Sequence, residues 1–243
     1  MARRALPSIP TGSMADIAFL LLVFWLMTTT LESDSGILRQ LPPIEENPDD
    51  VIVKKRNVYE VLVNFRNELL VEGDFAQITD LKGGAMEFLT NTGVFTEKPG
   101  DEDLTSRTWV RRADVQATIN GIEQKIQEAA DEDNEKAYKK QLASWQAKMD
   151  AIEFFGEYRE LVPAAVISLQ NDKGTSYNTY IIVQNELAAA LRQLRDDLCQ
   201  KHWQMNYGDF DPENNDDHKR KVLAVRKVFP NKISEAEPKD SRN

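Results

Sequence analysis

The longest uninterrupted hydrophobic run in the chain lies close to its N-terminus. Every residue at positions 17–27 is apolar, and alanine, threonine and leucine extend this run to the roughly 17 residues that a membrane-spanning helix requires. The run ends in Thr-Thr-Thr-Leu-Glu-Ser-Asp, without the small-residue cleavage site of a secretory signal peptide, and it has no polar face. We therefore predict an uncleaved transmembrane helix at residues 13–31, rather than a signal peptide or a buried core helix.

The charges that flank this run predict its orientation. Arg3 and Arg4 precede it, whereas Glu32 and Asp34 follow it directly. Because basic residues are retained on the cytoplasmic side of a membrane, we expect residues 1–12 in the cytoplasm and the long C-terminal part outside.

Asp16 is the one carboxylate inside the predicted helix. A charged side chain at the centre of a bilayer costs about 2.5–3.5 kcal/mol, and less near an end. Asp16 therefore either marks the cytoplasmic boundary and caps the helix, or it has a partner and a function; removal from water favours the neutral form of a carboxyl group, which would let it carry a proton. Helical spacing places these residues on the same face, which we predict to meet a partner: Ser13, Leu20, Val23, Met27 and Thr30.

The next part of the chain is first polar and contains prolines, and then alternates between apolar and polar residues. Residues 32–55 are predicted to form an extended linker. The pattern then predicts a strand at 58–65 with Val61, Val63 and Phe65 on one side, a turn at 66–67, and a returning strand at 68–71 that ends at 72–73. Asp80 is expected to cap a helix whose inward face consists of Leu81, Ala85, Phe88 and Leu89.

Two helical stripes follow the loop that we predict at residues 93–108. The first consists of Val115, Ile119, Ile122, Ile126 and Ala129, and the second of Tyr138, Leu142, Trp145, Met149 and Ile152. A short polar break at 131–134 separates them, so the pattern predicts an antiparallel coiled-coil hairpin. Two matched stripes bury one another, which we favour over the alternative that the hairpin is a docking arm for a partner.

The last third of the chain predicts the rest of an α+β domain. We expect a strand at 165–169, a turn at 171–174, a short returning strand at 175–177 and a long helix at 179–203. The inward residues of that helix are predicted to be Leu187, Leu191, Leu194 and Leu198. A last helix at 219–229 should bury Val222, Val225 and Phe229, and an edge strand at 232–234 precedes a tail.

Composition and motifs limit the chemistry. A net charge of −10 and a pI near 4.9 argue against nucleic acid as a partner, because phosphate binding needs a clustered basic surface. Cys199 is the single cysteine and is expected to be a packed small hydrophobe. The sequence around 209–211, His202 and His218 lacks the spacing of a calcium or zinc site, and no catalytic motif is present. We expect no enzyme, no catalytic residue, no metal and no cofactor.

The N-terminal motif resembles that of a known family. Pro-Thr-Gly-Ser-Met-Ala-Asp at 10–16, the apolar run after it, and the later segments Gly36-Ile37-Leu38 and Leu41-Pro42-Pro43 resemble the ExbD/TolR family of biopolymer-transport proteins. The resemblance implies that Asp16 carries protons in an energy-transducing motor of the bacterial inner membrane. It also implies an ExbB/TolQ-like polytopic partner, a TonB-like transducer engaged by the linker residues just named, a second copy of the chain, and membrane lipid around the helix.

The chain departs from the family pattern in two places. The more familiar branch has Thr-Pro close before the aspartate, whereas here Pro10 lies six residues before Asp16, which leaves the subfamily and the transported ion open. The helical hairpin resembles an insertion into a usually much smaller outer domain.

The expected domain organisation follows from the hydrophobic pattern and from the family resemblance. It comprises a cytoplasmic N-terminus (1–12), a transmembrane helix (13–31), a periplasmic linker (32–55), the first part of a periplasmic domain of two helices on a mixed sheet (56–92), an inserted loop and hairpin (93–162), the second part of the domain (163–234) and a disordered tail (235–243). The alternatives to the TonB-type motor subunit are a membrane-tethered structural or binding protein that uses the hairpin, and a TolR-like or flagellar-type stator subunit.

Overall fold

The computed structural model describes residues 11–28, 54–128 and 131–238, and within the first helix it describes the side chains of residues 14–24. The chain divides into two compact units, residues 1–41 and 42–243, which are described separately. The described part of the first unit is a single helix, α1 (Thr11–Thr28). Its many leucine, methionine and alanine residues favour a helix, and no proline interrupts it.

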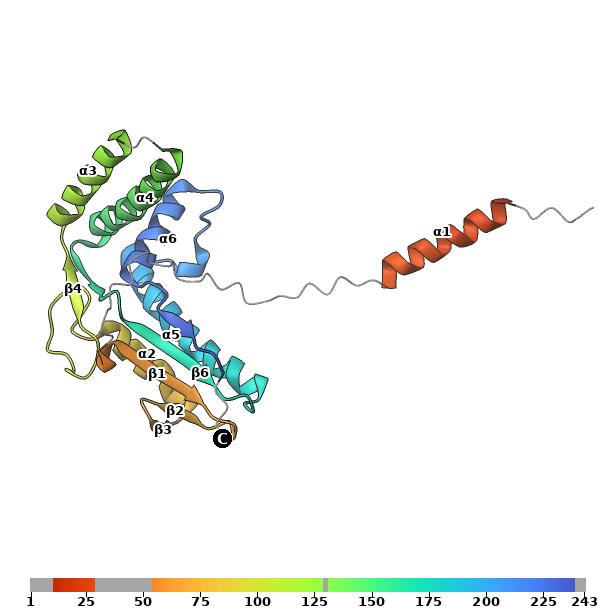
Figure 1. Cartoon of the computed structure of the whole chain (residues 1–243), viewed down its shortest axis with the longest axis horizontal. Helices are drawn as coiled ribbons and strands as arrows, with labels where there is room; N and C mark the ends of the chain where they lie inside the picture. The colour runs from red at the N-terminus through yellow and green to blue at the C-terminus, as the bar shows by residue number, and fades with distance from the viewer. Residues whose placement is uncertain (1–10, 29–53, 129–130, 239–243) are drawn as a thin grey trace, which may run out of the picture. The chain divides into compact units, whose positions relative to one another are not determined.

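The second unit is built on a five-stranded mixed sheet of the order β3-β2-β1-β6-β7 (Figure 1). The strands are β1 (Val58–Val63), β2 (Leu69–Val71), β3 (Asp74–Ala76), β6 (Val166–Asn171) and β7 (Ile233–Glu235). β1 pairs in parallel with β6, and β6 in parallel with β7, whereas β1–β2 and β2–β3 are antiparallel. The sheet thus joins the antiparallel strands β1, β2 and β3, which follow one another in sequence, to two parallel strands from later in the chain.

Two helices, α2 (Ile78–Thr90) and α5 (Tyr177–Trp203), pack against each other on one face of this sheet, behind β1 and β6 in Figure 1. Alternate residues of β1 point into this layer, where Val61 and Val63 are fully buried. The ring of Tyr59 lies 5.4 Å from that of Phe88 on α2. The predicted inward faces are confirmed: Leu81, Ala85, Phe88 and Leu89 on α2, and Leu187, Leu191, Leu194 and Leu198 on α5, are all buried.

A second module is formed by the part of the chain that lies, in sequence, between α2 and β6. It consists of β4 (Arg107–Val110), α3 (Arg112–Glu128), α4 (Glu132–Phe155) and β5 (Tyr158–Leu161). β4 and β5 form a separate antiparallel pair, and α3 and α4 pack side by side (Figure 1). Lys125 lies over the ring of Tyr138 at one end of the helix pair, and Arg112 contacts Met149 at the other, so the two helices run antiparallel as predicted.

The hairpin also packs against the C-terminal helix α6 (Asp216–Val228). The guanidinium of Arg220 on α6 lies 2.5 Å from the carboxylate of Asp150 on α4. On α6, Val222, Val225 and Val228 are buried, and Phe229 directly after it is buried as well. The predicted inward face of this last helix is confirmed, and so is the edge strand, which is β7.

Several expected elements were wrong in detail. β1 ends at Val63, so Phe65 lies in the following turn with 43% of its surface exposed. Asp80 does not cap α2, which begins two residues earlier after Gln77. α4 begins at Glu132, inside the predicted break at 131–134, and Asp131 caps it by accepting the N–H of Asp133.

The predicted returning strand at 175–177 is also wrong. Ser176 instead caps α5, its hydroxyl accepting the N–H of Thr179, and the hydroxyl of Thr175 donates to the carbonyl oxygen of Val63 at 2.9 Å. The start of the predicted tail is ordered, because Glu235 ends β7 and the N–H of Ala236 donates to Leu169. Most of the predicted linker, residues 32–53, lies outside the described residues, and its last residue Lys55 begins a 3-10 turn, η1 (Lys55–Asn57).

Candidate functional site

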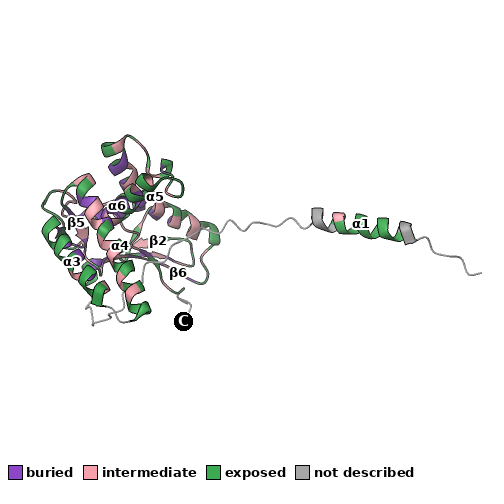
Figure 2. Ribbon diagram, turned by 90° about the horizontal axis from the view of Figure 1, so that it is seen from above, coloured by how far each residue is buried: buried purple, intermediate pink, exposed green. Residues whose placement is uncertain are grey.

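Asp16 is the only charged residue in the sequence of α1, and it lies in the second turn of that helix. The apolar side chains around it are largely exposed within this unit (Figure 2), with exposed fractions between 59% and 65% at Met14, Ile17, Phe19, Leu20, Leu21, Leu22 and Phe24. A helix that is apolar on all sides is normally covered by lipid or protein. The surroundings of Asp16 in the cell are therefore set by whatever covers this helix.

The helical backbone brings part of the predicted face together. Leu20 and Val23 follow Asp16 at four and seven positions, which places the three residues on one side of α1. Ser13 and Met27 belong to the same helix. Thr30 and the proposed partner segment, Gly36, Ile37, Leu38, Leu41, Pro42 and Pro43, lie outside the described residues. Among the residues that the structure describes, none forms a helix both long and apolar enough to cross a membrane.

In the second unit, a buried polar network lies at the point where the chain enters the domain. Asn57 accepts a hydrogen bond from the hydroxyl of Thr105 (3.1 Å), and the amide of Asn91 donates to the carbonyl oxygen of Thr105 (3.0 Å). All three side chains are buried, Thr105 completely. Because buried polar groups are costly unless they are paired, these bonds fix the entry turn η1 to the loop that follows α2.

Two buried arginines continue this network at the base of the hairpin. Arg107 on β4 donates to the carbonyl oxygens of Leu89, Val228 and Arg159, and so joins the C-terminal ends of α2 and α6 to β5. Burial, together with the nearby charge of Arg159, lowers the pKa of Arg107 to about 10. A cation at the C-terminal end of a helix is favoured by the helix dipole, which offsets part of the cost of burial.

Structural contacts are made by the other titratable residues that the sequence analysis considered: His202, His218, Asp211 and Cys199. His218 accepts the N–H of Asp211 (3.1 Å), and the carboxylate of Asp211 accepts the N–H groups of Glu213 and Asn214. These polar groups of the loop are therefore hydrogen-bonded to one another. His202 lies edge-on to Phe155 at 4.9 Å, and burial lowers its pKa. Within the described part of the chain, no group of three histidine, cysteine or acidic side chains is arranged to hold a metal ion. Cys199 is fully buried, as the helical pattern predicts, and burial raises its pKa to about 12.

Sequence reasoning did not identify Asn57, Thr105, Arg107 or Arg159 as important residues. Each is a polar residue in a segment without hydrophobic periodicity, so no local signal distinguishes it from a surface residue. Their partners are far away in the sequence: Arg107 and Arg159 are separated by 52 positions, and Asn57 and Thr105 by 48.

Comparison with known proteins identifies the family of this chain. A family described as Biopolymer transport protein ExbD/TolR matches residues 2–195. The chain belongs to the ExbD/TolR family, as its N-terminal motif predicts. The match ends within α5, so α6 and β7 lie beyond it. No curated protein and no solved structure matches the chain.

Proposed function

We propose that this chain is the ExbD-like subunit of a motor in the bacterial inner membrane that is driven by the proton-motive force and energises transport across the cell envelope in a TonB-type system. The observation that carries the proposal is the single carboxylate of Asp16 in an otherwise uncharged helix, in a chain whose family is one of biopolymer transport proteins. Such a carboxylate is expensive in a membrane and is rarely retained there without a function.

In this proposal Asp16 alternates between its protonated and ionised forms inside a bundle of partner helices. Moving one charge through the membrane potential supplies about 2.3 kcal/mol per 100 mV, so several protons suffice for a mechanical step. The chain contributes one helix, so the proton path requires an ExbB/TolQ-like polytopic partner. That partner would contact the face formed by Ser13, Leu20, Val23, Met27 and Thr30.

The proposed topology places residues 1–12 in the cytoplasm, a single span at 13–31, and the α+β unit in the periplasm. The flanking charges of the hydrophobic run support this orientation. The linker segments Gly36-Ile37-Leu38 and Leu41-Pro42-Pro43 are proposed to engage a TonB-like transducer, and the outer unit to work as a homodimer. The hairpin is proposed to be an insertion in that unit, at 93–162.

The test is a purification of the intact chain from its native membrane in mild detergent, with mass spectrometry of the bound partners, for the natural chain and for Asp16→Asn. We expect both forms to recover an ExbB/TolQ-like protein, and transport to be lost only with Asp16→Asn. Asp34→Asn, which removes a carboxylate just after the run, is the matched control and should transport normally.

The two alternatives give different results in the same experiment. A membrane tether that works through its hairpin would recover envelope proteins without a polytopic partner, and Asp16→Asn would remain active, which would refute the motor. A TolR-like or flagellar-type stator subunit would also depend on Asp16, but its co-purifying partners would belong to a different envelope machine.

A further inference from the structure

A hollow of about 420 Å³ lies where the chain enters the second unit. Three separate segments line it: Lys55, Arg56 and Val58 from the entry turn and the start of β1, Glu72 from the β2–β3 turn, and Asp103 and Leu104 from the loop between α2 and β4. Its volume is within the range of small-molecule sites in proteins. Nothing in the proposed motor role assigns a function to it.

The walls of this pocket are held in place by buried hydrogen bonds. Asn57 directly follows the basic pair and is bonded to Thr105, which directly follows Leu104. Asn91 accepts the N–H of Asp101 and donates to its carbonyl oxygen. These two bonds hold the loop that carries Asp103 against the end of α2. A preformed pocket spares a ligand the entropy cost of ordering its own site.

The position of the Glu72 carboxylate is also defined. Glu72 and Gly73 form the two-residue turn between β2 and β3, both with positive φ (54° and 95°), a conformation that asparagine or glycine adopts more readily than glutamate. One carboxylate oxygen of Glu72 accepts the N–H of Glu60 at 2.8 Å. From the described residues the second oxygen accepts no hydrogen bond, so it can accept one from a ligand.

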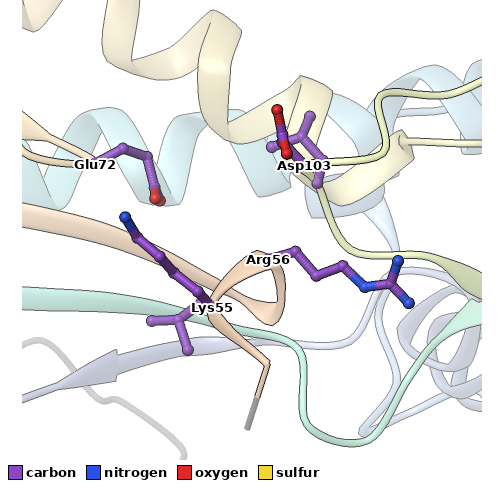
Figure 3. Close-up of a pocket in the computed structure, with 6 residues that line it drawn as sticks. Lys55, Arg56, Glu72 and Asp103 are labelled. Atoms are coloured by element: carbon purple, nitrogen blue, oxygen red, sulfur yellow. The ribbon is translucent and has the colours of Figure 1, made fainter.

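The charges of the pocket are balanced, two cations and two carboxylates. In Figure 3, Lys55 extends toward Glu72, and Arg56 extends in the other direction, beneath the loop that carries Asp103 in this view. Among the described residues, none of these four side chains forms an ion pair within 4.0 Å. The opposite charges thus line the same hollow with space between them.

This arrangement favours a ligand that carries both a positive and a negative charge. A purely anionic ligand would be repelled by Glu72 and Asp103, and a metal ion or other cation by Lys55 and Arg56. We propose that the pocket binds a small zwitterion, either a free amino acid or a short peptide with both termini free. Its carboxylate would pair with Lys55 and its ammonium with the two acidic side chains, while an apolar side chain would contact Val58 and Leu104.

Isothermal titration calorimetry of the full chain in mild detergent tests the proposal, with L-leucine and L-alanyl-L-leucine as probes for the two sources. We expect saturable binding of at least one probe to a single site. N-Acetyl-L-leucine, which lacks the ammonium, and L-leucinamide, which lacks the carboxylate, should each bind at least tenfold more weakly than L-leucine if the free amino acid is the ligand. If only the dipeptide binds, its N-acetylated and amidated forms serve as the same controls.

Variants of the chain locate the site. Glu72→Gln keeps an acceptor for the N–H of Glu60 but loses its charge, and Lys55→Gln removes a cation; each should weaken binding at least tenfold. Glu102→Gln, which alters the neighbour of Asp103 outside the lining, should leave binding unchanged. Asp103→Asn serves as an independent variant if Glu72→Gln impairs folding. No saturable binding up to about 10 mM, equal affinity for the blocked forms, or unchanged affinity in all three pocket variants would overturn the proposal.

Discussion

Arg107 and Arg159 each donate a hydrogen bond to the backbone carbonyl oxygen of the other: Nε of Arg107 lies 2.8 Å from the oxygen of Arg159, and Nη2 of Arg159 lies 3.0 Å from the oxygen of Arg107. Only 3% and 6% of the two residues are exposed. Two like charges are held side by side because the two arginines together donate to five peptide carbonyl oxygens, and the carboxylate of Glu97 lies 3.5 Å from Arg159. The pair joins the base of the hairpin to the ends of α2 and α6.

Replacing Arg107 should therefore destabilise the domain. Arg107→Met leaves the carbonyl oxygens of Leu89, Val228 and Arg159 without their donor, and we expect a loss of about 3 kcal/mol in the free energy of unfolding. Urea unfolding of the full chain in detergent, followed by circular dichroism, measures it. Arg111→Met, at an exposed position four residues later, is the matched control and should change stability by less than about 0.5 kcal/mol.

The hydrogen bond between Thr105 and Asn57 should contribute measurably to stability. Thr105→Val keeps the shape of the side chain but leaves the buried oxygen of Asn57 without this donor, so we expect a loss of about 1–2 kcal/mol. The same substitution at the exposed Thr108 should have little effect. Equal unfolding midpoints for the two variants would mean that the network is not important for stability.

The core between the sheet and its helices should tolerate truncation poorly. Leu187 on α5 is fully buried, so Leu187→Ala creates a cavity and should cost about 2–5 kcal/mol. Leu223 on α6 is 39% exposed, and Leu223→Ala should cost much less. Comparing the two variants by thermal unfolding separates the effect of burial from the effect of changing a helical leucine.

The stability of the domain should fall at alkaline pH partly because of Cys199. Its pKa is raised from 9.0 to about 12 by burial, so the folded state retains a proton that the unfolded state releases. The resulting stabilisation is fully present below pH 9 and is lost as the pH rises toward 12.

Cys199→Ala tests this dependence. The free energy of unfolding of the variant should fall less steeply between pH 9 and 11, by up to about 1.4 kcal/mol per pH unit. Tyr59, whose pKa is raised to about 12 mainly by burial, acts in the same direction in both forms, so the difference between the two curves isolates the thiol. Parallel curves would show that the thiol does not titrate differently in the folded state.

Local pattern predicted the long elements well. The inward faces of α2, α5 and α6 follow from residues spaced by three and four positions, because any helix of that sequence presents them on one side. The helical hairpin is correct for the same reason. The short strands β3, β4 and β5 were missed. β2 and β7 are equally short but were predicted, so alternation over three or four residues identifies some strands and not others.

The sequence by itself determined the apolar N-terminal helix, the single carboxylate within it and the family to which the chain belongs, because these depend on composition and order within a short segment. Tertiary structure alone decided which distant segments come together. Val61 of β1 lies beside Leu169 of β6, and Arg107 beside Arg159, although long stretches of chain separate the members of each pair. The folding of the chain also places Lys55, Glu72 and Asp103 around one pocket, because a mixed sheet brings together segments that no local pattern connects.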